Sequence, residues 1–585
     1  MWAVALAALC TPMVATNAPT PIDGRIAGES LTAGPWAGAL GIRMTTAALM
    51  ALDRSGEPRE ETPINLFRTP STSQVESGRA VPRPSTEDLS GAAGTALPTA
   101  QHVGLSFNVM VGTAVPDNIG AVGPTQFLSV LNHGLKTFDK RTGAPDGVLN
   151  LGLSTFFQPV LLPGTSAFDP NVKFDRLSGR WFVTAATFSP RFVLAVSAGG
   201  TVTSNTAWTF FYIAQDQVPP VGDAGCVTDM PQVGIDVNAL YVSMGLLSPC
   251  NRGAALVIRK SSVLGDGPVV VSVFRNVTLG TAMDNFDSTA TQGYFFDGWA
   301  RFHRVADPAG IPSISFIPIT GNSAMEASVG VPFAIRHKGN NLETGSTGVY
   351  NRADWVGRMW TASASGAPIR NGHAWLYRVV GVDNNGVGHP GTSDPSLNSR
   401  TALLWAEFAG LNTSAATVAR WGVVYAPSAV NDVHQRNYWL PSLMVSGQGH
   451  LVLGSSAAGT NEYINAAVAG VLAGDAAGTF RVPELFAASG SAYNGPTDPS
   501  RFNMRRWGDY SATSLDPCDD MTVWTIQQFA AAPDQWGVQV AKFLAPPPPS
   551  VWSIAPRVLP RGNASINVTI TGTPANGEGF YDPGL

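Results

Sequence analysis

Three carboxylates in one short loop are the first residues whose types and spacing favour chemistry. The segment 516–520 reads Asp-Pro-Cys-Asp-Asp and places Asp516, Asp519 and Asp520 close together. Because Ca²⁺ prefers several oxygen ligands, this loop is a candidate calcium site. It does not follow the twelve-residue order of an EF-hand, and aspartates at hairpin turns commonly cap the backbone. We therefore favour turn capping and expect no required cofactor, with Ca²⁺ as the one candidate.

A second candidate site combines arginines with aromatic and acidic residues. Arg506 precedes Trp507, and Asp509 and Tyr510 follow closely. A guanidinium beside an aromatic ring can stack on a sugar or hold its carboxylate, so Arg506, Asp509, Tyr510 and Arg420 are candidate ligand-binding residues. The structural alternative buries the tryptophan and pairs the arginine with an aspartate, because neighbouring strand residues face opposite sides. We expect Trp507 to be buried and Asp509 to accept hydrogen bonds.

No compact catalytic motif stands out. The eight histidines are never closer than sixteen positions, which excludes a local zinc motif. Ser197 lies in a sequence that only approximates a nucleophile elbow and lacks its strand-to-helix context. Glycoside hydrolysis needs paired carboxylates or a tyrosine nucleophile, and no spacing ties such residues together here. We assign no catalytic residue and favour a binding or structural role. The alternative is a hydrolase or lyase that acts on polysaccharide, sialidase-like in architecture.

A recurring hairpin pattern indicates the elements that position these residues. Two apolar strand segments joined by a short turn, often opened by Asp, recur at 172–183, 233–242, 443–453 and 513–525. Weaker copies lie at 122–130, 292–296 and 350–360. Seven such units predict an all-β fold with a single β-propeller of about seven four-stranded blades over residues 101–545. A β-helix would have a shorter repeat, and a sandwich would rarely need seven units.

The repeats also carry two local expectations. Asp175 and Asp236 occupy equivalent positions in two repeats, so both should cap turns. Ring closure should pair a strand near Phe127 with the last unit around residues 536–540, because closure removes exposed strand edges.

The flanking regions differ in composition from the repeats. Residues 1–18 are apolar and end in small residues, which indicates a signal peptide; no basic residue precedes the apolar run, and a buried strand or helix is the alternative. Residues 19–100, rich in Ser, Thr, Pro and Ala, predict a mobile leader or a loose wrap. A proline-rich linker at 546–550 separates the propeller from residues 551–585, whose alternation is typical of the beginning of an Ig-like sandwich. Because 35 residues cannot close a sandwich, we interpret the chain as a fragment.

Charge and cysteine placement narrow the partners. Only 13% of the residues are charged, the net charge is −5 and no basic cluster is present, which argues against a nucleic-acid partner. No apolar run has the length of a membrane span. Cys226 and Cys250 lie symmetrically about Asn238, so a hairpin about that turn would allow a disulfide; two buried thiols are the alternative. We expect a secreted, extracellular monomer that binds a glycan or an extracellular protein.

Two motifs resemble those of a known group of proteins. The segment 506–514 reads Arg-Trp-Gly-Asp-Tyr-Ser-Ala-Thr-Ser, and an earlier motif runs from Asp169 through Phe182. Together they resemble secreted, largely uncharacterised bacterial β-propeller proteins with C-terminal Ig-like modules. The resemblance covers about residues 101–585 and implies export and a propeller, without an activity to transfer. Gln528 stands where those proteins usually carry Glu.

Overall fold

The computed structural model describes residues 30–54, 96–97, 102–544 and 551–572. Gaps inside these ranges fall at 248, 278–279, 298–300, 331–336, 340–348, 351–365, 391–396, 427–435, 477–478, 496, 499–503, 559–561 and 563–566. The described residues form 38 strands and four short helices. The fold is therefore all-β, as the sequence predicts.

Most of the molecule divides into seven antiparallel units of four strands, which we call sheets and number in chain order; sheets 4 and 5 are hydrogen-bonded into one larger sheet. Sheet 1 contains β6 (Ile119–Val122), β7 (Gln126–Leu131), β8 (Gly134–Asp139) and β9 (Pro145–Leu151). Sheet 2 contains β10 (Ala167–Asp175), β11 (Arg180–Thr187), β12 (Arg191–Ser197) and β13 (Ala207–Ala214). Sheet 3 contains β14 (Thr228–Ile235), β15 (Ala239–Leu246), β16 (Arg252–Arg259) and β17 (Val270–Arg275). Sheet 4 contains β18 (Thr281–Asn285), β19 (Gln292–Phe296), β20 (Arg301–Ala306) and β21 (Ser313–Thr320).

The later sheets repeat this order. Sheet 5 contains β23 (Ala367–Arg370), β24 (His373–Val382), β25 (Arg400–Ala409) and β26 (Ala416–Val424). Sheet 6 contains β27 (Asn437–Val445), β28 (Leu451–Gly459), β29 (Glu462–Val471) and β31 (Glu484–Ala487). Sheet 7 contains β34 (Ala512–Leu515), β35 (Val523–Ala532), β36 (Gln535–Leu544) and β5 (His102–Gly112).

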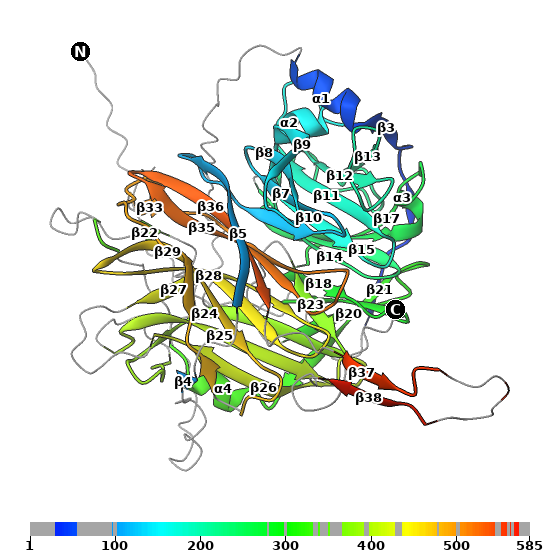
Figure 1. Ribbon diagram of the computed structural model, residues 1–585. Coiled ribbons are helices and arrows are strands. Elements are labelled where there is room, and N and C mark those ends of the chain that lie inside the picture. The colour runs from blue at the N-terminus through cyan, green and yellow to red at the C-terminus, as the bar shows by residue number, and fades with distance from the viewer. Residues whose placement is uncertain are drawn as a thin grey trace, which may run out of the picture.

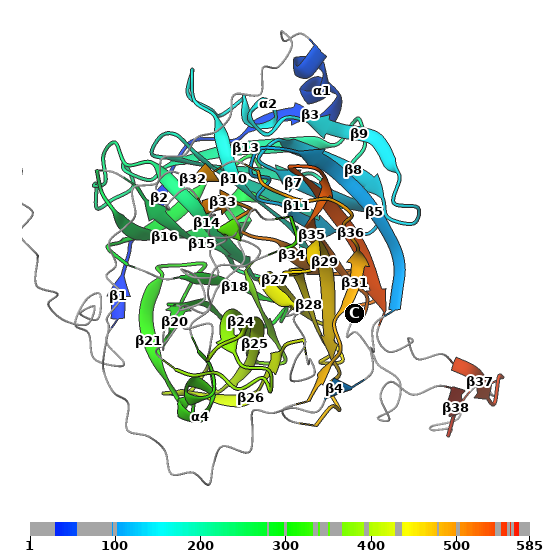
Figure 2. The same cartoon turned by 90° about the vertical axis from the view of Figure 1, so that its left-hand side faces the viewer.

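The sheets follow one another around a ring (Figures 1 and 2). Their first strands contact one another in the order β6, β10, β14, β18, β23, β27 and β34, and β34 in turn contacts β6. Sheets 4 and 5 are joined more closely than the others, because β18 pairs with β23 in parallel and β21 pairs with β26 in parallel. Each first strand therefore lies toward the middle of the ring, and each fourth strand lies toward its outside.

The ring closes through a strand from near its beginning. β5 pairs with β36 along their length, with Phe107 opposite Val540, and completes sheet 7. The expectation that the closing strand lies near Phe127 is wrong. Phe127 belongs to β7, which has β6 on one edge and β8 on the other, so it offers no free edge for pairing.

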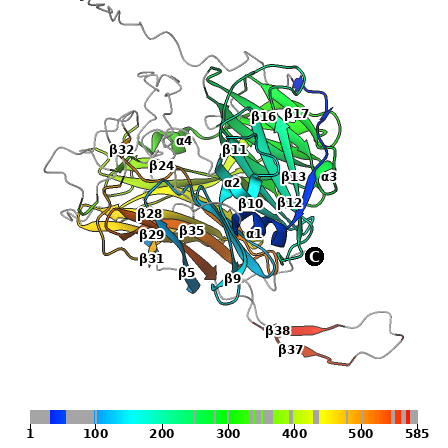
Figure 3. The same cartoon turned by 90° about the horizontal axis from the view of Figure 1, so that it is seen from above.

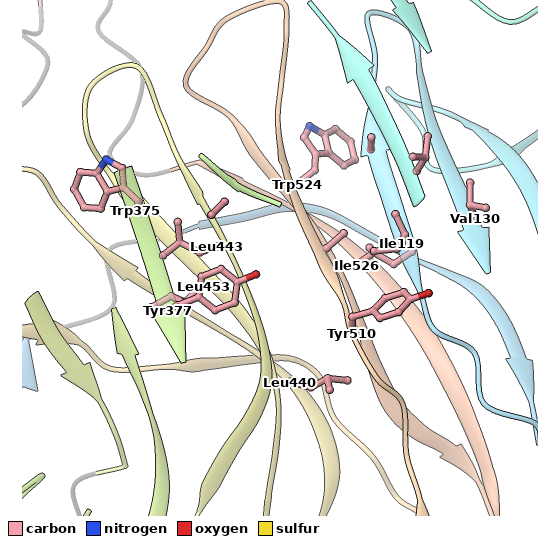
Figure 4. Close-up of a cluster of buried hydrophobic side chains, with 14 of the residues drawn as sticks. Ile119, Val130, Trp375, Tyr377, Leu440, Leu443, Leu453, Tyr510, Trp524 and Ile526 are labelled. Atoms are coloured by element: carbon pink, nitrogen blue, oxygen red, sulfur yellow. The ribbon is translucent and has the colours of Figure 1, made fainter. Parts of the chain in front are cut away.

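Both faces of an inner sheet are buried because each sheet stands between two neighbours. In β15, Leu240 and Val242 contact one apolar cluster, while Tyr241 contacts another. Gly293 of sheet 4 allows this close packing, since a Cβ there would lie 1.9 Å from the ring of Tyr241. Figure 4 shows the same interlocking elsewhere, with Ile119 of sheet 1 beside Ile526 of sheet 7. Alternating apolar residues on both faces are thus what the ring requires.

Residues 30–54 run along the outside of the ring, which matches the wrap expected for part of the leader (Figure 2). β1 (Ser30–Thr32) pairs with β21, β2 (Trp36–Ala37) with β17 and β3 (Ile42–Thr45) with β13. Helix α1 (Thr46–Arg54) then contacts β9. The segment thereby adds a fifth strand to three sheets and covers their outer edges.

The remaining elements are short. They are α2 (Leu153–Phe157), α3 (Lys260–Val263), α4 (Ser323–Ala327), β4 (Ala96–Leu97), β22 (Val349–Tyr350), β30 (Phe480–Arg481), β32 (Thr497–Asp498), β33 (Met504–Arg506), β37 (Val551–Ala555) and β38 (Thr569–Gly572). β37 and β38 pair with each other and project from the seven sheets (Figures 1 and 3). They fall in the region predicted to begin an Ig-like sandwich, which stays a prediction.

A disulfide joins Cys226 and Cys250, as the sequence predicts. Their Cα atoms are 5.8 Å apart. Cys226 precedes β14, and Cys250 lies between β15 and β16, so the disulfide crosslinks the chain at one end of sheet 3. Cys518 is a free, exposed cysteine.

Candidate functional site

A cavity opens among the first strands on the side of the ring where they turn into the second strands. We call this side the hairpin face; the turns at 175–180 and 515–523 lie on it. The opposite side, where the chain enters each first strand, is the leading face. The cavity measures about 50 Å³, and six of the seven first strands or the residues just after them contribute to its wall. The wall combines apolar residues with Lys173, Asp175, Arg176 and Asp284.

Asp520 connects three sheets beside this cavity. Its Oδ1 accepts a hydrogen bond from Arg176 Nη1, which follows β10 in sheet 2. Its Oδ2 accepts from Arg370 Nη2 at 2.5 Å, from the end of β23 in sheet 5. Asp520 lies in the turn between β34 and β35, and its side chain is only 2% exposed. One buried carboxylate therefore ties sheet 7 to sheets 2 and 5.

Asp520 also connects to sheet 6 through its backbone. Its carbonyl accepts a hydrogen bond from Gly447 N–H at 2.8 Å. The residue has a φ of +53°, a conformation uncommon for residues with a side chain. The turn that holds Asp520 is thus fixed from several directions.

Asp284 forms a second connection across the cavity. Its Oδ2 lies 2.5 Å from Lys173 Nζ, and its Oδ1 accepts a hydrogen bond from Ile235 N–H at 3.0 Å. These contacts join sheet 4 to sheets 2 and 3. Burial raises the pKa of the Asp284 carboxyl, whereas the neighbouring Lys173 acts to lower it. The ammonium group therefore compensates for the removal of the carboxylate from water.

The repeated turn aspartates cap their turns, as the sequence predicts for Asp175 and Asp236. Asp175 accepts hydrogen bonds from Leu177 N–H at 3.2 Å and Ser178 N–H at 3.1 Å. Asp236 accepts from Asn238 N–H at 2.7 Å. These bonds satisfy backbone donors that the turn would otherwise leave without partners.

Two of the turn aspartates each bind a lysine from the next sheet. Lys260, after the third strand of sheet 3, lies 2.5 Å from Asp175 of sheet 2. Lys140, after the third strand of sheet 1, lies 2.6 Å from Asp516 of sheet 7. The turn carboxylates therefore hold neighbouring sheets together as well as capping turns.

The three candidate calcium ligands point to separate partners. Asp516 binds Lys140 and accepts from Trp524 Nε1 at 3.2 Å. Asp519 accepts from Thr522 N–H at 2.9 Å, while Asp520 binds the two arginines. Over the described residues, no group of three or more His, Cys, Asp or Glu side chains is arranged to hold a metal ion. Calcium binding stays a prediction.

Arg420 lies in sheet 5, apart from the other candidate ligand-binding residues. Its Nε donates to Glu407 Oε2 at 2.7 Å, and Glu407 Oε1 also lies 2.6 Å from His373 Nδ1. The guanidinium stands over the rings of Trp375 and Trp405. This arrangement matches the structural alternative, in which arginine pairs with a carboxylate and covers buried aromatic rings.

Asp509 and Tyr510 lie at the leading face, and the side chain of Arg506 lies outside the described residues. Asp509 N–H donates to Asp117 Oδ1 at 2.9 Å, and the Tyr510 hydroxyl lies 3.5 Å from the carbonyl oxygen of Pro170. Tyr510 is buried, as Figure 4 shows. Trp507 is also fully buried, which confirms its expected position. The structure brings Asp509 and Tyr510 together but places Arg420 and Asp520 elsewhere.

A chain of hydrogen bonds continues along the leading face. Asp117 Oδ2 accepts from Asn132 Nδ2 at 2.9 Å, and Asn132 Oδ1 accepts from Asp169 N–H at 2.9 Å. Asp169 Oδ2 then accepts from Met230 N–H at 2.9 Å. With the bond from Asp509, these contacts connect sheets 7, 1, 2 and 3 in order.

The sequence contained a signal for the leading face that the hairpin pattern alone missed. Proline follows Asp169, Met230 and Leu440, and each of these three residues has a positive φ. Each lies where the first strand of its sheet shifts register against the second. In these three sheets, the segment between the proline and the hairpin turn is therefore the first strand. Sequence reasoning also missed four charged residues at or beside the cavity, Lys173, Arg176, Asp284 and Arg370. Of these, only Lys173 has a signal in the sequence, because it is a charged residue within an otherwise apolar first strand.

Comparisons with known proteins do not assign a family. No protein-family model matches the chain, and no curated protein matches it. Among solved structures, it is similar to an α-L-arabinanase of Penicillium chrysogenum complexed with arabinobiose, at 10% identity and a TM-score of 0.31, with 74% of this chain and 98% of that chain covered. It is also similar to a subtype N11 neuraminidase-like protein of influenza A/flat-faced bat/Peru/033/2010, at 10% identity and a TM-score of 0.27, with 72% and 99% covered.

A third similar structure is an exo-β-1,3-galactanase from Clostridium thermocellum, at 10% identity and a TM-score of 0.26, with 63% of this chain and 81% of that chain covered. Likenesses this weak establish no activity for the chain. The resemblance drawn from its motifs stays a prediction. No helix in the described part of the chain has the length and apolar character needed to cross a membrane.

Proposed function

We propose that the seven sheets are the blades of one β-propeller that serves as an extracellular binding module for a glycan. The ring of first strands supports this architecture, because radial repetition of four-stranded sheets is the defining feature of propellers. The disulfide supports export, because disulfides persist mainly in oxidising compartments.

One observation carries the preference for binding over catalysis. At the cavity, Asp175, Asp284 and Asp520 each contact a lysine or arginine from another sheet. A general acid, base or nucleophile must exchange a proton or form a bond with substrate. These carboxylates instead serve as acceptors that hold the sheets in place. A cavity lined by paired charges suits recognition.

The test is a titration of the purified protein with a panel of neutral and acidic polysaccharides. Saturable binding without release of reducing ends is the expected result. Arg43→Gln provides the control, because Arg43 lies in β3 on the outer edge of sheet 2 and forms an exposed pair with Asp266. Turnover of a polysaccharide would favour the enzymatic alternative, and a panel that neither binds nor is cleaved would contradict the proposal.

A further inference from the structure

Two arginines from separate sheets converge on a single carboxylate at the hairpin face. Arg176 and Arg370 each donate to a different oxygen of Asp520. The planar guanidinium suits carboxylate recognition, because its N–H groups match the two oxygens of the anion. The geometry of this pair is therefore that of a carboxylate receptor, with one side chain of the protein as its occupant.

Arg370 retains a donor that Asp520 does not use. The Arg370 side chain is 90% buried, and its buried Nε has no hydrogen-bond partner among the residues that the structure describes. The guanidinium packs against the ring of Phe286, with 5.1 Å between the guanidinium carbon and the ring centre. A buried donor without an acceptor is unfavourable, so an additional oxygen at this position would be bound favourably.

The adjoining cavity limits what can enter. Arg176 and Phe286 both line it, and its volume is about 50 Å³. A water molecule needs about 10–15 Å³ of such space, so the cavity has room for a carboxylate group. Asn285 and Ser514 also line the cavity and are half-buried, so polar side chains form part of its wall.

We propose that Arg176 and Arg370 form the recognition site for the carboxylate of an acidic glycan, and that Asp520 occupies this site in the free protein. The proposal rests on the proposed binding function and names its ligand class, a glycan that carries uronic acid. The carboxylate inserts between the arginines while the sugar hydroxyls remain at the rim near Asn285 and Ser514. A uronic acid fits better than an acidic side chain of a protein, because its ring places hydroxyls next to the carboxylate.

Exchange of Asp520 for the ligand conserves the charge balance of the site. One carboxylate replaces another, so both arginines keep an anionic partner. Departure of Asp520 breaks its contacts with Arg176, Arg370 and Gly447, and the ligand carboxylate restores the contacts with the two arginines. Because Asp520 occupies the site in the free protein, the apparent Kd equals the intrinsic Kd divided by the fraction of molecules in which the site is open.

The decisive experiment removes the internal occupant. Asp520→Ala is titrated with glucuronate, acetate and, as a neutral control, glucose, and Kd and thermal stability are measured at constant ionic strength. We expect glucuronate to bind Asp520→Ala at least about tenfold more tightly than the wild type, because the competing carboxylate is gone. Acetate should raise the Tm of the variant more than an equal concentration of chloride does, and glucose should have no effect.

A second substitution tests the receptor itself. Adding Arg370→Met to Asp520→Ala should abolish both the glucuronate binding and the stabilisation by acetate. Asp519→Ala is the matched control, because Asp519 lies in the same turn and accepts hydrogen bonds from Met521 N–H and Thr522 N–H of that turn. If Asp520→Ala does not fold, Asp520→Asn keeps the shape of the side chain without its charge, and it should also bind glucuronate more tightly than the wild type.

The outcomes separate this inference from the proposed function. Equal glucuronate affinity in the wild type and the Asp520 variants would overturn the carboxylate site, even if neutral glycans bind elsewhere. Binding of an acidic peptide without binding of glucuronate would overturn the ligand class. If the Asp520 variants bind glucuronate but no polysaccharide binds the wild type, the site stands and the proposed function fails.

Discussion

The two faces of the ring hold the same sheets together by different means. At the leading face, Asp117 and Asp169 accept hydrogen bonds from backbone N–H groups of other sheets, and a disulfide staples the end of sheet 3. At the hairpin face, Asp284 and Asp520 bind side-chain cations from other sheets. The contacts between sheets thus use mainly neutral donors at the leading face and cations at the hairpin face, whereas within sheet 3 the buried Asp223 also binds Arg252 and Arg275 at the leading face.

This difference has an energetic consequence. A buried ion pair contributes little net stability, because desolvation offsets most of the attraction. Loss of one partner is nonetheless severe, because it leaves an uncompensated charge out of water. A hydrogen bond from a backbone N–H to a carboxylate has a smaller desolvation cost and a smaller attraction than an ion pair. Its loss therefore lowers the free energy of unfolding less. The hairpin face should therefore be the more sensitive of the two to single substitutions.

The largest effect is expected for Asp520→Ala. The substitution leaves Arg176 and Arg370 without their shared anion, which should lower the free energy of unfolding by about 3–5 kcal/mol. Asp519→Ala in the same turn removes only local caps and should cost about 1 kcal/mol. Urea unfolding of the two variants measures the difference. Equal losses would show that the arginines do not depend on Asp520.

Removal of the disulfide should have the next largest effect. Cys226 and Cys250 are 24 positions apart, and the loss of such a bridge typically costs about 3 kcal/mol through the greater freedom of the unfolded chain. Urea unfolding of the Cys226→Ala, Cys250→Ala double variant measures this cost. Cys518→Ala serves as the control for cysteine loss and should unfold like the wild type. A double variant as stable as the wild type would contradict a stapling role at the leading face.

Asp117→Asn should have a smaller effect at the leading face. Asp117 accepts from both Asp509 N–H and Asn132 Nδ2, and an asparagine amide can replace only one of its two acceptor oxygens. Its φ of +44° is tolerated by asparagine, so the backbone should not add to the cost. We expect a loss of about 1–2 kcal/mol in urea unfolding. Asp266→Asn, at an exposed pair, should change stability by less than about 0.5 kcal/mol.

The smallest expected effect is a pH dependence at the hairpin face. Burial lowers the pKa of the His450 imidazole below its usual value of 6.5, although Asp475 acts to raise it. His450 Nδ1 accepts a hydrogen bond from Ala473 N–H at 3.0 Å, which only the neutral ring can do. The unfolded chain therefore binds a proton more readily, and stability should fall as the pH drops below about 6.5.

His450→Asn tests this dependence, because asparagine retains an acceptor near the same position. The Tm of the wild type should fall more between pH 7.5 and 5.5 than the Tm of the variant does. Parallel pH profiles for the two proteins would show that His450 is not the group responsible.

The sequence predicted the features that depend on neighbours along the chain. Asp175 and Asp236 bond to backbone groups two or three positions away, so a turn pattern is enough to identify their role. The Cys226–Cys250 bridge follows from a hairpin about Asn238 for the same reason. The recurring hairpins likewise predicted an all-β chain and the positions of most first and second strands.

The contacts at the cavity depend on positions far apart in the chain. Arg176 and Arg370 lie 344 and 150 positions from Asp520. Only closure of the whole ring brings these residues together, and closure uses β5 rather than the strand near Phe127. A pattern confined to one hairpin contains no information about such pairings. For this reason the carboxylates were predicted as turn caps or calcium ligands, and their arginine partners were missed.

A double-mutant cycle on Arg370 and Asp520 tests most directly the claim that charged contacts tie the sheets at the hairpin face. Urea unfolding of Arg370→Met, Asp520→Asn and the double variant gives the coupling energy between sheets 5 and 7. The account predicts a favourable coupling of at least about 1 kcal/mol, with the double variant more stable than the two single losses added together imply. Additive losses within about 0.5 kcal/mol would contradict it, because they would show that the two side chains contribute independently.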